Sequence, residues 1–329
     1  MKKLVFTTAL LCVAVINNAM AQMPTLKVYT YDSFVSEWGP GPQLKALFES
    51  TCECKVEFVG LADGVSILTR LKIEGKNSRA DVVLGLDNNL MLEAADLNVL
   101  AAHNVDTDML SVPGGWTDST FVPFDWGYFA FIYDSEKLET PPASLDELIE
   151  SDLSVLYQDP RTSTPGLGLM LWMQSIYGEQ ASAKYKKLSS HTVTVTPDWW
   201  GAYEMFTSGE ADVVLSYSTS PAYHVVAEGV TKYKAAAFKE GHYQQVEVAA
   251  MTKNTEQPEL AQAFLEFLIS KPAQEIIPVT NWMMPVRSDV TLPAIFDEVI
   301  EVSPILLEPK TVKANRQAWI NNWLEATAK

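Results

Sequence analysis

The sequence is poor in positively charged residues. It contains 24 Lys and Arg against 41 Asp and Glu, so its formal net charge is −17 over 329 residues. The basic residues are scattered along the chain rather than gathered in one segment. A nucleic-acid-binding protein needs a basic face that neutralises phosphates, and anionic lipid likewise attracts basic segments. The composition therefore argues against nucleic acid and against a membrane surface as partners.

Long apolar runs are also absent, apart from one near the N-terminus. Residues 4–16 form an apolar run that follows Lys2 and Lys3 and precedes a small-residue site ending at Ala21. This order is typical of a secretory signal peptide, and the run is shorter than the roughly 20 residues of a membrane span. We expect residues 1–21 to be cleaved, which takes the net charge to −19 and leaves a secreted, soluble protein.

Cysteine is rare, with three residues in the whole chain. Cys12 falls inside the predicted signal peptide, so only Cys52 and Cys54 remain in the mature protein. An oxidising compartment favours a disulfide between these two neighbours. A metal site is disfavoured because no second Cys or His pair follows at a ligand-like spacing.

Catalytic signatures are missing as well. The chain has no G-x-S-x-G elbow, no H-E-x-x-H motif and no phosphate-binding P-loop. It has four histidines at unrelated spacings, which we expect to be surface or structural residues: His103, His191, His224 and His242. The sequence thus predicts neither catalytic residues nor a cofactor, and we expect a protein that is not an enzyme.

Short β-rich runs alternate with helical patterns along the mature region. The predicted strands are 26–31, 55–59, 81–84, 154–157, 192–196 and 212–215. The predicted helices are 41–49, 65–74, 165–177, 200–207, 258–269 and 312–324. Residues 144–147 (SLDE) match a capping box, which predicts the start of a further short helix at Ser144. A βαβαβ rhythm of this kind predicts an α/β fold in which mainly parallel sheets are flanked by helices.

One internal sequence repeat, called here the echo segments, predicts two similar α/β lobes. Residues 80–87 (ADVVLGLD) resemble residues 211–218 (ADVVLSYS), and each copy leads into a polar loop. Two α/β lobes predict a ligand between them, because ligands of open α/β sheets bind beyond the carboxyl ends of strands. The loops at those ends are 31–33, 87–89 and 217–220. The aromatic stretch 120–133 is a predicted crossing strand or hinge.

Two features suggest binding rather than catalysis. Residues 162–166 place hydroxyls ahead of a predicted helix, with Thr164 as the expected N-cap and free N–H groups that suit a phosphate or another anion. Plain helix capping explains this local pattern slightly better. Aromatic residues also follow strands or stand beside turn-forming residues, where they are either core residues or faces for a cation. These are Tyr31, Trp38, Trp199, Tyr217, Tyr223 and Trp282.

The same segments resemble a known family. The resemblance rests on residues 29–34, 38–42, 63–66, 74–78, 80–89, 158–168, 215–217 and 281–283. In these segments the sequence is similar to the periplasmic thiamine-binding proteins of bacterial thiamine ABC importers. The likeness covers nearly the whole mature chain, departing from the family pattern near residues 152–156 and at Met284.

The resemblance implies a two-lobed periplasmic binding protein of type II, in the group that includes ferric-ion binders. We expect one lobe from residues 22–122 with 245–284, and the other from 123–244 with 285–329. The implied ligands are thiamine, thiamine monophosphate and thiamine diphosphate, delivered to an inner-membrane ABC permease and its ATPase by a monomeric protein. The implied contacts are Tyr31, Asp63, Gly64, Ser163, Thr164, Trp199, Tyr217, Ser218, Thr219, Ser220, Pro221, Tyr223 and Trp282.

The chemistry of thiamine fits these residues. Its thiazolium cation suits Tyr and Trp faces, and its aminopyrimidine can pair with the Asp63 carboxylate. Phosphates of the esters can bind at the helix start behind Ser163 and Thr164. The acidity of the chain raises the encounter rate with a cation by roughly tenfold or more at low salt.

Two alternatives stay open. Thiaminase I resembles this fold but attacks thiamine with a cysteine in the cleft, whereas Cys52 and Cys54 lie in a different segment. Ferric-ion binders use neighbouring tyrosines as ligands, whereas Tyr217 and Tyr223 are six residues apart.

Overall fold

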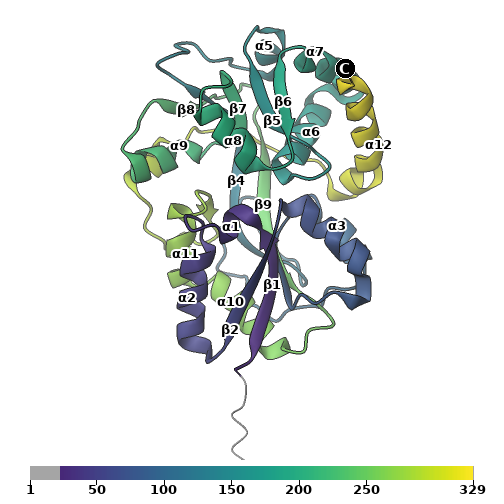
Figure 1. Ribbon diagram of the computed structural model, residues 1–329, viewed down its shortest axis with the longest axis vertical. Helices are drawn as coiled ribbons and strands as arrows, with labels where there is room; N and C mark the ends of the chain where they lie inside the picture. Colours follow the sequence, from purple (N-terminus) through teal and green to yellow (C-terminus); the bar gives the residue numbers. More distant parts are fainter. Residues whose placement is uncertain (1–22, 329) are drawn as a thin grey trace, which may run out of the picture.

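The computed structural model describes residues 23–328, which form two lobes joined by two long strands (Figure 1). The predicted signal peptide and its cleavage site lie outside the described residues. Among residues 23–328, no helix combines the length and the apolar character needed to cross a bilayer.

The lower lobe in Figure 1 is built on three parallel strands. They are β2 (Lys55–Leu61), β1 (Thr25–Tyr31) and β3 (Val82–Asp87), in that order across the sheet. Its helices are α1 (Asp32–Val35), α2 (Gly41–Cys52), α3 (Gly64–Glu74), α4 (Met91–Asp96), α10 (Pro258–Leu268) and α11 (Lys271–Ile276). The predicted strands and helices of this part are confirmed, with ends that differ by a few residues.

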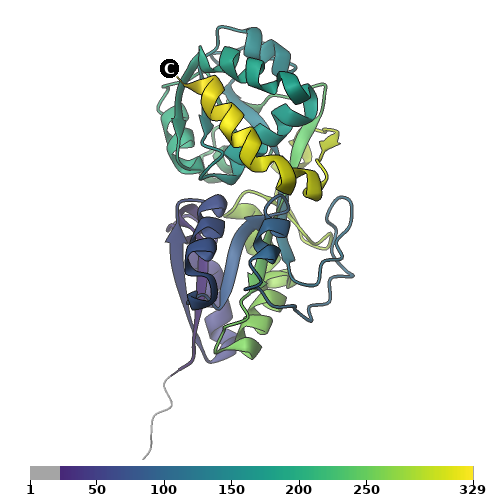
Figure 2. The ribbon, with the colours of Figure 1, turned by 90° about the vertical axis from the view of Figure 1, so that its right-hand side faces the viewer.

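The upper lobe repeats the plan, with β5 (Val155–Gln158) between β7 (Val213–Tyr217) and β6 (Thr192–Thr196) in parallel pairing. Its helices are α5 (Leu145–Glu150), α6 (Thr164–Tyr177), α7 (Ala181–Ser189), α8 (Trp199–Thr207), α9 (Ser220–Tyr223) and α12 (Pro309–Thr327). Short strands β8 (Tyr233–Ala235), β10 (Met284–Pro285) and β11 (Pro304–Ile305) pair along the crossing strands. Figure 2 shows α12 across the upper lobe, and its Arg316 pairs with Glu93 of α4 at 2.7 Å.

Two strands run from one lobe into the other: β4 (Val122–Asp134) and β9 (His242–Met251) (Figure 1). They are antiparallel to each other; β9 pairs with β3 below, and β4 pairs with β7 above. The crossing strand predicted at 120–133 is confirmed as β4. No strand was predicted at β9, because its Gln244 and Gln245 are polar yet buried and hide the pattern of a core strand.

The two echo segments occupy equivalent positions. β3 lies between the parallel strand β1 and the crossing strand β9, and β7 lies between the parallel strand β5 and the crossing strand β4. The prediction of two similar α/β lobes is therefore confirmed, although each sheet is mixed where a crossing strand joins it antiparallel. The division of the chain at residues 122, 244 and 284 stays a prediction.

Helix α6 packs closely against the upper sheet because it carries two glycines. A Cβ at Gly166 would lie 2.3 Å from the carbonyl oxygen of Gln158, and one at Gly168 would lie 2.0 Å from the ring of Phe129. Both distances are far below van der Waals contact. Gly166 thus allows the start of α6 to approach the end of β5, and Gly168 allows it to approach the crossing strand β4.

We expect Gly168→Ala to lower the free energy of unfolding by about 1–3 kcal/mol, because the buried Phe129 ring must move to admit the new methyl group. The measurement is urea unfolding followed by circular dichroism. Gly201→Ala in α8 is the matched control, since its Cβ would have no neighbour closer than 3.4 Å. That control should leave stability unchanged or raise it by up to about 1 kcal/mol. Equal losses in both variants would contradict the packing argument.

Two local predictions are confirmed and one is wrong. Cys52 and Cys54 form a disulfide, with their Cα atoms 5.1 Å apart. Ser144 caps α5 by accepting the Glu147 N–H at 3.1 Å. The N-cap of α6, however, is Ser163 rather than Thr164, and its side chain makes no capping hydrogen bond. Three of the four histidines are buried.

Candidate functional site: the cleft between the lobes

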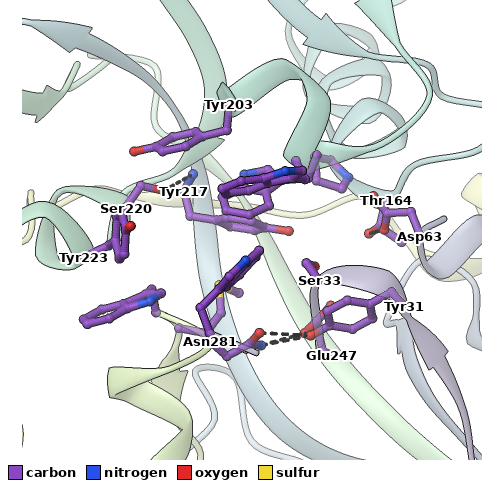
Figure 3. A pocket seen from close by; sticks show the side chains of 16 residues that line it. Tyr31, Ser33, Asp63, Thr164, Tyr203, Tyr217, Ser220, Tyr223, Glu247 and Asn281 are labelled. Carbon is purple, nitrogen blue, oxygen red and sulfur yellow. Dashed lines mark hydrogen bonds between the residues drawn. The ribbon is translucent and has the colours of Figure 1, made fainter. Parts of the chain in front are cut away.

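A cleft lies between the two lobes and is lined by 16 side chains (Figure 3). Nine of them were singled out from the sequence: Tyr31, Trp38, Asp63, Thr164, Trp199, Tyr217, Ser220, Tyr223 and Trp282. Two more, Ser33 and Pro165, lie in the predicted segments 31–33 and 162–166. The other five were not singled out: Trp200, Tyr203, Glu247, Asn281 and Met283. Residues from both sequence halves therefore meet at one place, at the carboxyl ends of β1 and β7.

The start of α8 supplies an aromatic wall. Asp198 caps this helix through the Gly201 N–H at 2.8 Å and so fixes the orientation of Trp199. The Trp199 indole N–H donates to Ser216 Oγ at 2.8 Å, and its ring stacks on Tyr203 with centroids 5.1 Å apart. The nitrogen side of the indole is thereby anchored to β7.

A pair of tryptophans stands at the mouth of the cleft. The ring of Trp38, from the lower lobe, lies 4.8 Å from that of Trp200 and 6.3 Å from that of Trp199, both from the upper lobe. Trp38 and Trp200 are 41% and 40% exposed, so they separate the interior of the cleft from solvent. This contact joins the lobes through aromatic faces.

Three further aromatic residues line the cleft: Tyr217, Tyr223 and Trp282. Tyr217 at the end of β7 packs on Phe129 at 5.2 Å and donates to Gln245 Oε1 at 3.0 Å. The rings of Tyr223 and Trp282 meet edge to face at 5.5 Å. Trp282 has a φ of 56°, a left-handed conformation that is uncommon for a large residue and points to a functional constraint.

Asp63 joins the lobes by hydrogen bonds. Its Oδ2 accepts from Ser163 Oγ at 2.7 Å, and its Oδ1 accepts from Thr164 Oγ1 at 2.8 Å and from the Gly64 N–H at 2.7 Å. Burial raises the pKa of this carboxyl, while the hydrogen bonds oppose the rise. The anion at the start of α6 in this structure is thus a side chain of the other lobe, which explains why the hydroxyls do not cap their own helix.

A second group of carboxyls lies at the floor of the cleft, where Figure 3 shows Glu247, Tyr31 and Asn281 together. Tyr31 Oη donates to Glu247 Oε2 at 2.9 Å, and Asn281 Nδ2 donates to Asp125 Oδ2 at 2.7 Å. Burial raises the pKa of Asp125 to about 7. Burial and the neighbouring Asp125 raise the pKa of Glu247 well above its usual range.

Some predicted site residues lie beside the cleft rather than on its wall. Gly64, Ser163, Ser218, Thr219 and Pro221 are not among the lining side chains. Ser163 is buried behind Thr164 against Asp63, and the backbone N–H of Ser218 donates to the Tyr128 carbonyl at 2.8 Å. The loop 87–89 was expected at the ligand edge, but it is not part of the lining, because Asp87 turns back to bond Asn89 and Leu90.

Glu247 and Asn281 are the polar lining residues that the sequence did not indicate. Glu247 lies in the strand that was not predicted, and its role depends on Tyr31, which is 216 positions away. Asn281 belongs to a segment that carried the family resemblance, yet only its neighbour Trp282 was singled out. Sequence order gives no sign that these residues meet.

Two α/β lobes, two crossing strands and a lined cleft between the lobes define a solute-binding protein. Residues 33–275 match the family model described as bacterial extracellular solute-binding protein. The chain is 56% identical over 309 residues to the thiamine-binding periplasmic protein of Escherichia coli strain K12, covering 93% of this chain and 94% of that one. It is 43% identical over 328 residues to the protein of the same name from Haemophilus influenzae, covering 98% and 97%.

Solved structures agree with these relatives. A structure described as periplasmic thiamin binding protein superposes with a TM-score of 0.92 at 55% identity, covering 93% of this chain and 97% of that one. A ferric binding protein from Campylobacter jejuni shares the fold alone, with a TM-score of 0.75 at 17% identity over 92% and 99% of the two chains. The chain belongs to the family of thiamine-binding periplasmic proteins.

Proposed function

We propose that this protein captures thiamine in the cleft between its lobes and passes it to an ABC importer. The observation that carries the proposal is a cleft with aromatic walls and the buried carboxyls Asp63 and Glu247, in a chain 56% identical to a protein named for thiamine binding. Aromatic faces attract a desolvated cation by about 0.5–2 kcal/mol each, and a carboxylate adds a direct charge. Thiamine is flat, aromatic and permanently cationic.

The proposed contacts divide by chemistry. Trp199, Tyr217, Tyr223, Trp282 and Tyr31 supply faces for the two rings of thiamine. Asp63, with Gly64, Ser163 and Thr164 around it, is the proposed polar anchor for the aminopyrimidine. Residues 218–221 lead from the end of β7 into the start of α9. Ser220 Oγ forms a hydrogen bond with Ser216 Oγ at 2.7 Å.

The proposal includes thiamine monophosphate and thiamine diphosphate. A phosphate at the start of α6 would accept hydrogen bonds from the Ser163 and Thr164 hydroxyls in place of Asp63, with backbone N–H groups of the first turn behind them. The helix start is suited to an anion, because it already holds the Asp63 carboxylate.

Relatives named periplasmic support the same compartment for this chain. We propose that residues 1–21 act as a cleaved signal peptide, and that the mature protein works as a monomer. Its partner would be an inner-membrane permease with its ATPase. The lobe division at residues 122, 244 and 284 is proposed as the pair of bodies that close on the ligand.

The two alternative functions lack support in this chain. A thiaminase needs a cysteine nucleophile, but in the described residues the cysteines are joined to each other as a disulfide, and neither lines the cleft. A ferric site needs free tyrosinates, but Tyr217 and Tyr223 donate to Gln245 and Glu228. Iron should therefore produce no charge-transfer band.

The test is calorimetric titration of the mature protein with thiamine and its two phosphate esters. We expect one site per chain and an intact vitamin after incubation with a base acceptor. Absence of binding by all three compounds would overturn the proposal, and turnover of thiamine would favour the enzyme.

A further inference from the structure

Two carboxyl groups face each other in the floor of the cleft. Asp125 of β4 and Glu247 of β9 are register partners in the antiparallel pairing of the crossing strands, so their side chains emerge on the same face of the sheet. Both are almost fully buried, at 0% and 5% exposure. Glu247 lines the cleft, and Asp125 does not. The pair therefore has one member at the ligand surface and one behind it.

The surroundings of this pair are neutral or acidic. Glu247 accepts from Tyr31 Oη at 2.9 Å and from Gln245 Nε2 at 3.3 Å. Asn281 Nδ2 contacts both carboxyls, at 2.7 Å from Asp125 Oδ2 and 3.4 Å from Glu247 Oε2. Within residues 23–328, neither carboxyl forms an ion pair with Lys, Arg or His.

The remaining titratable groups near the pair add no positive charge. They are Tyr31 from β1, Tyr217 from β7, and the carboxyls Asp63 before α3 and Asp87 at the end of β3. Burial and the nearby carboxylates raise the pKa of both tyrosines well above the usual value, so the phenols stay neutral donors. Asp125 Oδ1 is buried and has no hydrogen-bond partner among the described residues.

Two adjacent carboxylates without a counter-cation do not both ionise in a buried site, so one proton is retained by the pair. Burial raises the pKa of Asp125 to about 7, and burial together with Asp125 raises that of Glu247. The empty floor of the cleft then carries one negative charge. A cation beside Glu247 would supply the missing positive charge.

This inference rests on the proposed capture of thiamine. We propose that Asp125 and Glu247 share one proton in the empty cleft and release it to solvent when the thiazolium cation binds, so that the pair selects for a cation. The charge balances because one positive charge enters as one proton leaves. A neutral molecule of the same shape does not stabilise the second negative charge, so the pair keeps its proton when that molecule binds.

The first test is calorimetric titration of the mature protein with thiamine in buffers that differ in ionisation enthalpy. We expect nearly one proton to be released per thiamine at about pH 7, with the release falling as the pH rises and the pair ionises before the ligand binds. The Kd should fall by up to tenfold for each pH unit over which the proton is released. Tight binding without proton release would overturn the shared proton and leave the proposed function intact, whereas no binding at any pH would overturn the proposed function.

A neutral isostere separates the cation from the rest of the molecule. In this probe carbon replaces the thiazolium nitrogen, so the aminopyrimidine and its own proton exchange are unchanged. We expect it to bind without releasing the proton and with an affinity that does not improve towards pH 8. Equal proton release by thiamine and its isostere would overturn the proposal.

Substitutions test whether the released proton comes from Asp125 and Glu247. The double variant Asp125→Asn with Glu247→Gln keeps the shapes of both side chains, and it should bind thiamine with no proton release and a flat pH profile. The control is Asp87→Asn, which removes another buried carboxyl whose pKa burial raises to about 6 but which lies outside the cleft lining. Proton release that persists in the double variant, or that disappears in the control, would contradict the assignment. The isostere comparison decides the question if the double variant does not fold.

Discussion

Replacing Trp199 with Ala should weaken thiamine binding at least tenfold, which corresponds to about 1.4 kcal/mol. The Trp199 ring lines the cleft, stacks on Tyr203 at 5.1 Å and is held by Ser216 at 2.8 Å, so it presents a rigid face at little entropic cost. Truncation removes that face and leaves the Ser216 hydroxyl without its donor. The measurement is the Kd from calorimetry at a fixed pH.

Trp319→Phe provides the control for this experiment. Trp319 lies on α12 among residues packed against the core and is not part of the cleft lining. We expect its Kd to match that of the unmodified protein. An unchanged Kd in Trp199→Ala would remove this residue from the proposed site.

A larger loss is expected for Asp63→Ala, at least a hundredfold or about 2.7 kcal/mol. The substitution leaves the Ser163 and Thr164 hydroxyls and the Gly64 N–H without their acceptor, at the point where the lobes touch. It also removes the carboxylate proposed to anchor the aminopyrimidine. Calorimetry measures the loss, and small-angle X-ray scattering should report a larger radius of gyration because the lobes separate.

Ser66→Ala is the control, because it tests whether losing another hydrogen bond between the lobes weakens thiamine binding as much as Asp63→Ala does. Ser66 Oγ donates to the Thr162 carbonyl at 3.3 Å, a longer hydrogen bond at the same junction. We expect its Kd to change less than threefold, since a neutral hydrogen bond contributes about 0.5–1.5 kcal/mol and this one is weak in geometry. If the two variants behave alike, Asp63 is not a specific anchor.

Local signals predicted much of this fold. The strand at β1, the capping box at Ser144 and the crossing strand β4 all follow from patterns within about a dozen residues. In β9 the pattern fails because Gln244, Gln245 and Glu247 are buried by neighbours from distant parts of the chain. Burial of a polar side chain depends on its tertiary partners, and hydrophobic periodicity does not record them.

The same limit applies to the site. The sequence predicts a helix cap or an anion site at the hydroxyls before α6. The structure pairs these hydroxyls with Asp63, which lies 100 positions before Ser163. Aromatic residues at strand ends could be singled out because their turn-like surroundings are local. The pairing of Asp125 with Glu247 could not be predicted, because it depends on the register of two strands more than 100 residues apart.

The route of the chain through both lobes also sets the order in which the protein can be completed. β3 pairs with β9, with Val82 opposite Met251. The lower sheet therefore lacks its antiparallel strand until most of the polypeptide has been made. Pairings of such long sequence separation form slowly, because loop closure must precede the contacts that reward it. In a nascent chain the lower lobe therefore cannot complete its sheet until β9 has been synthesised, so this lobe finishes folding late although its first strand is made first.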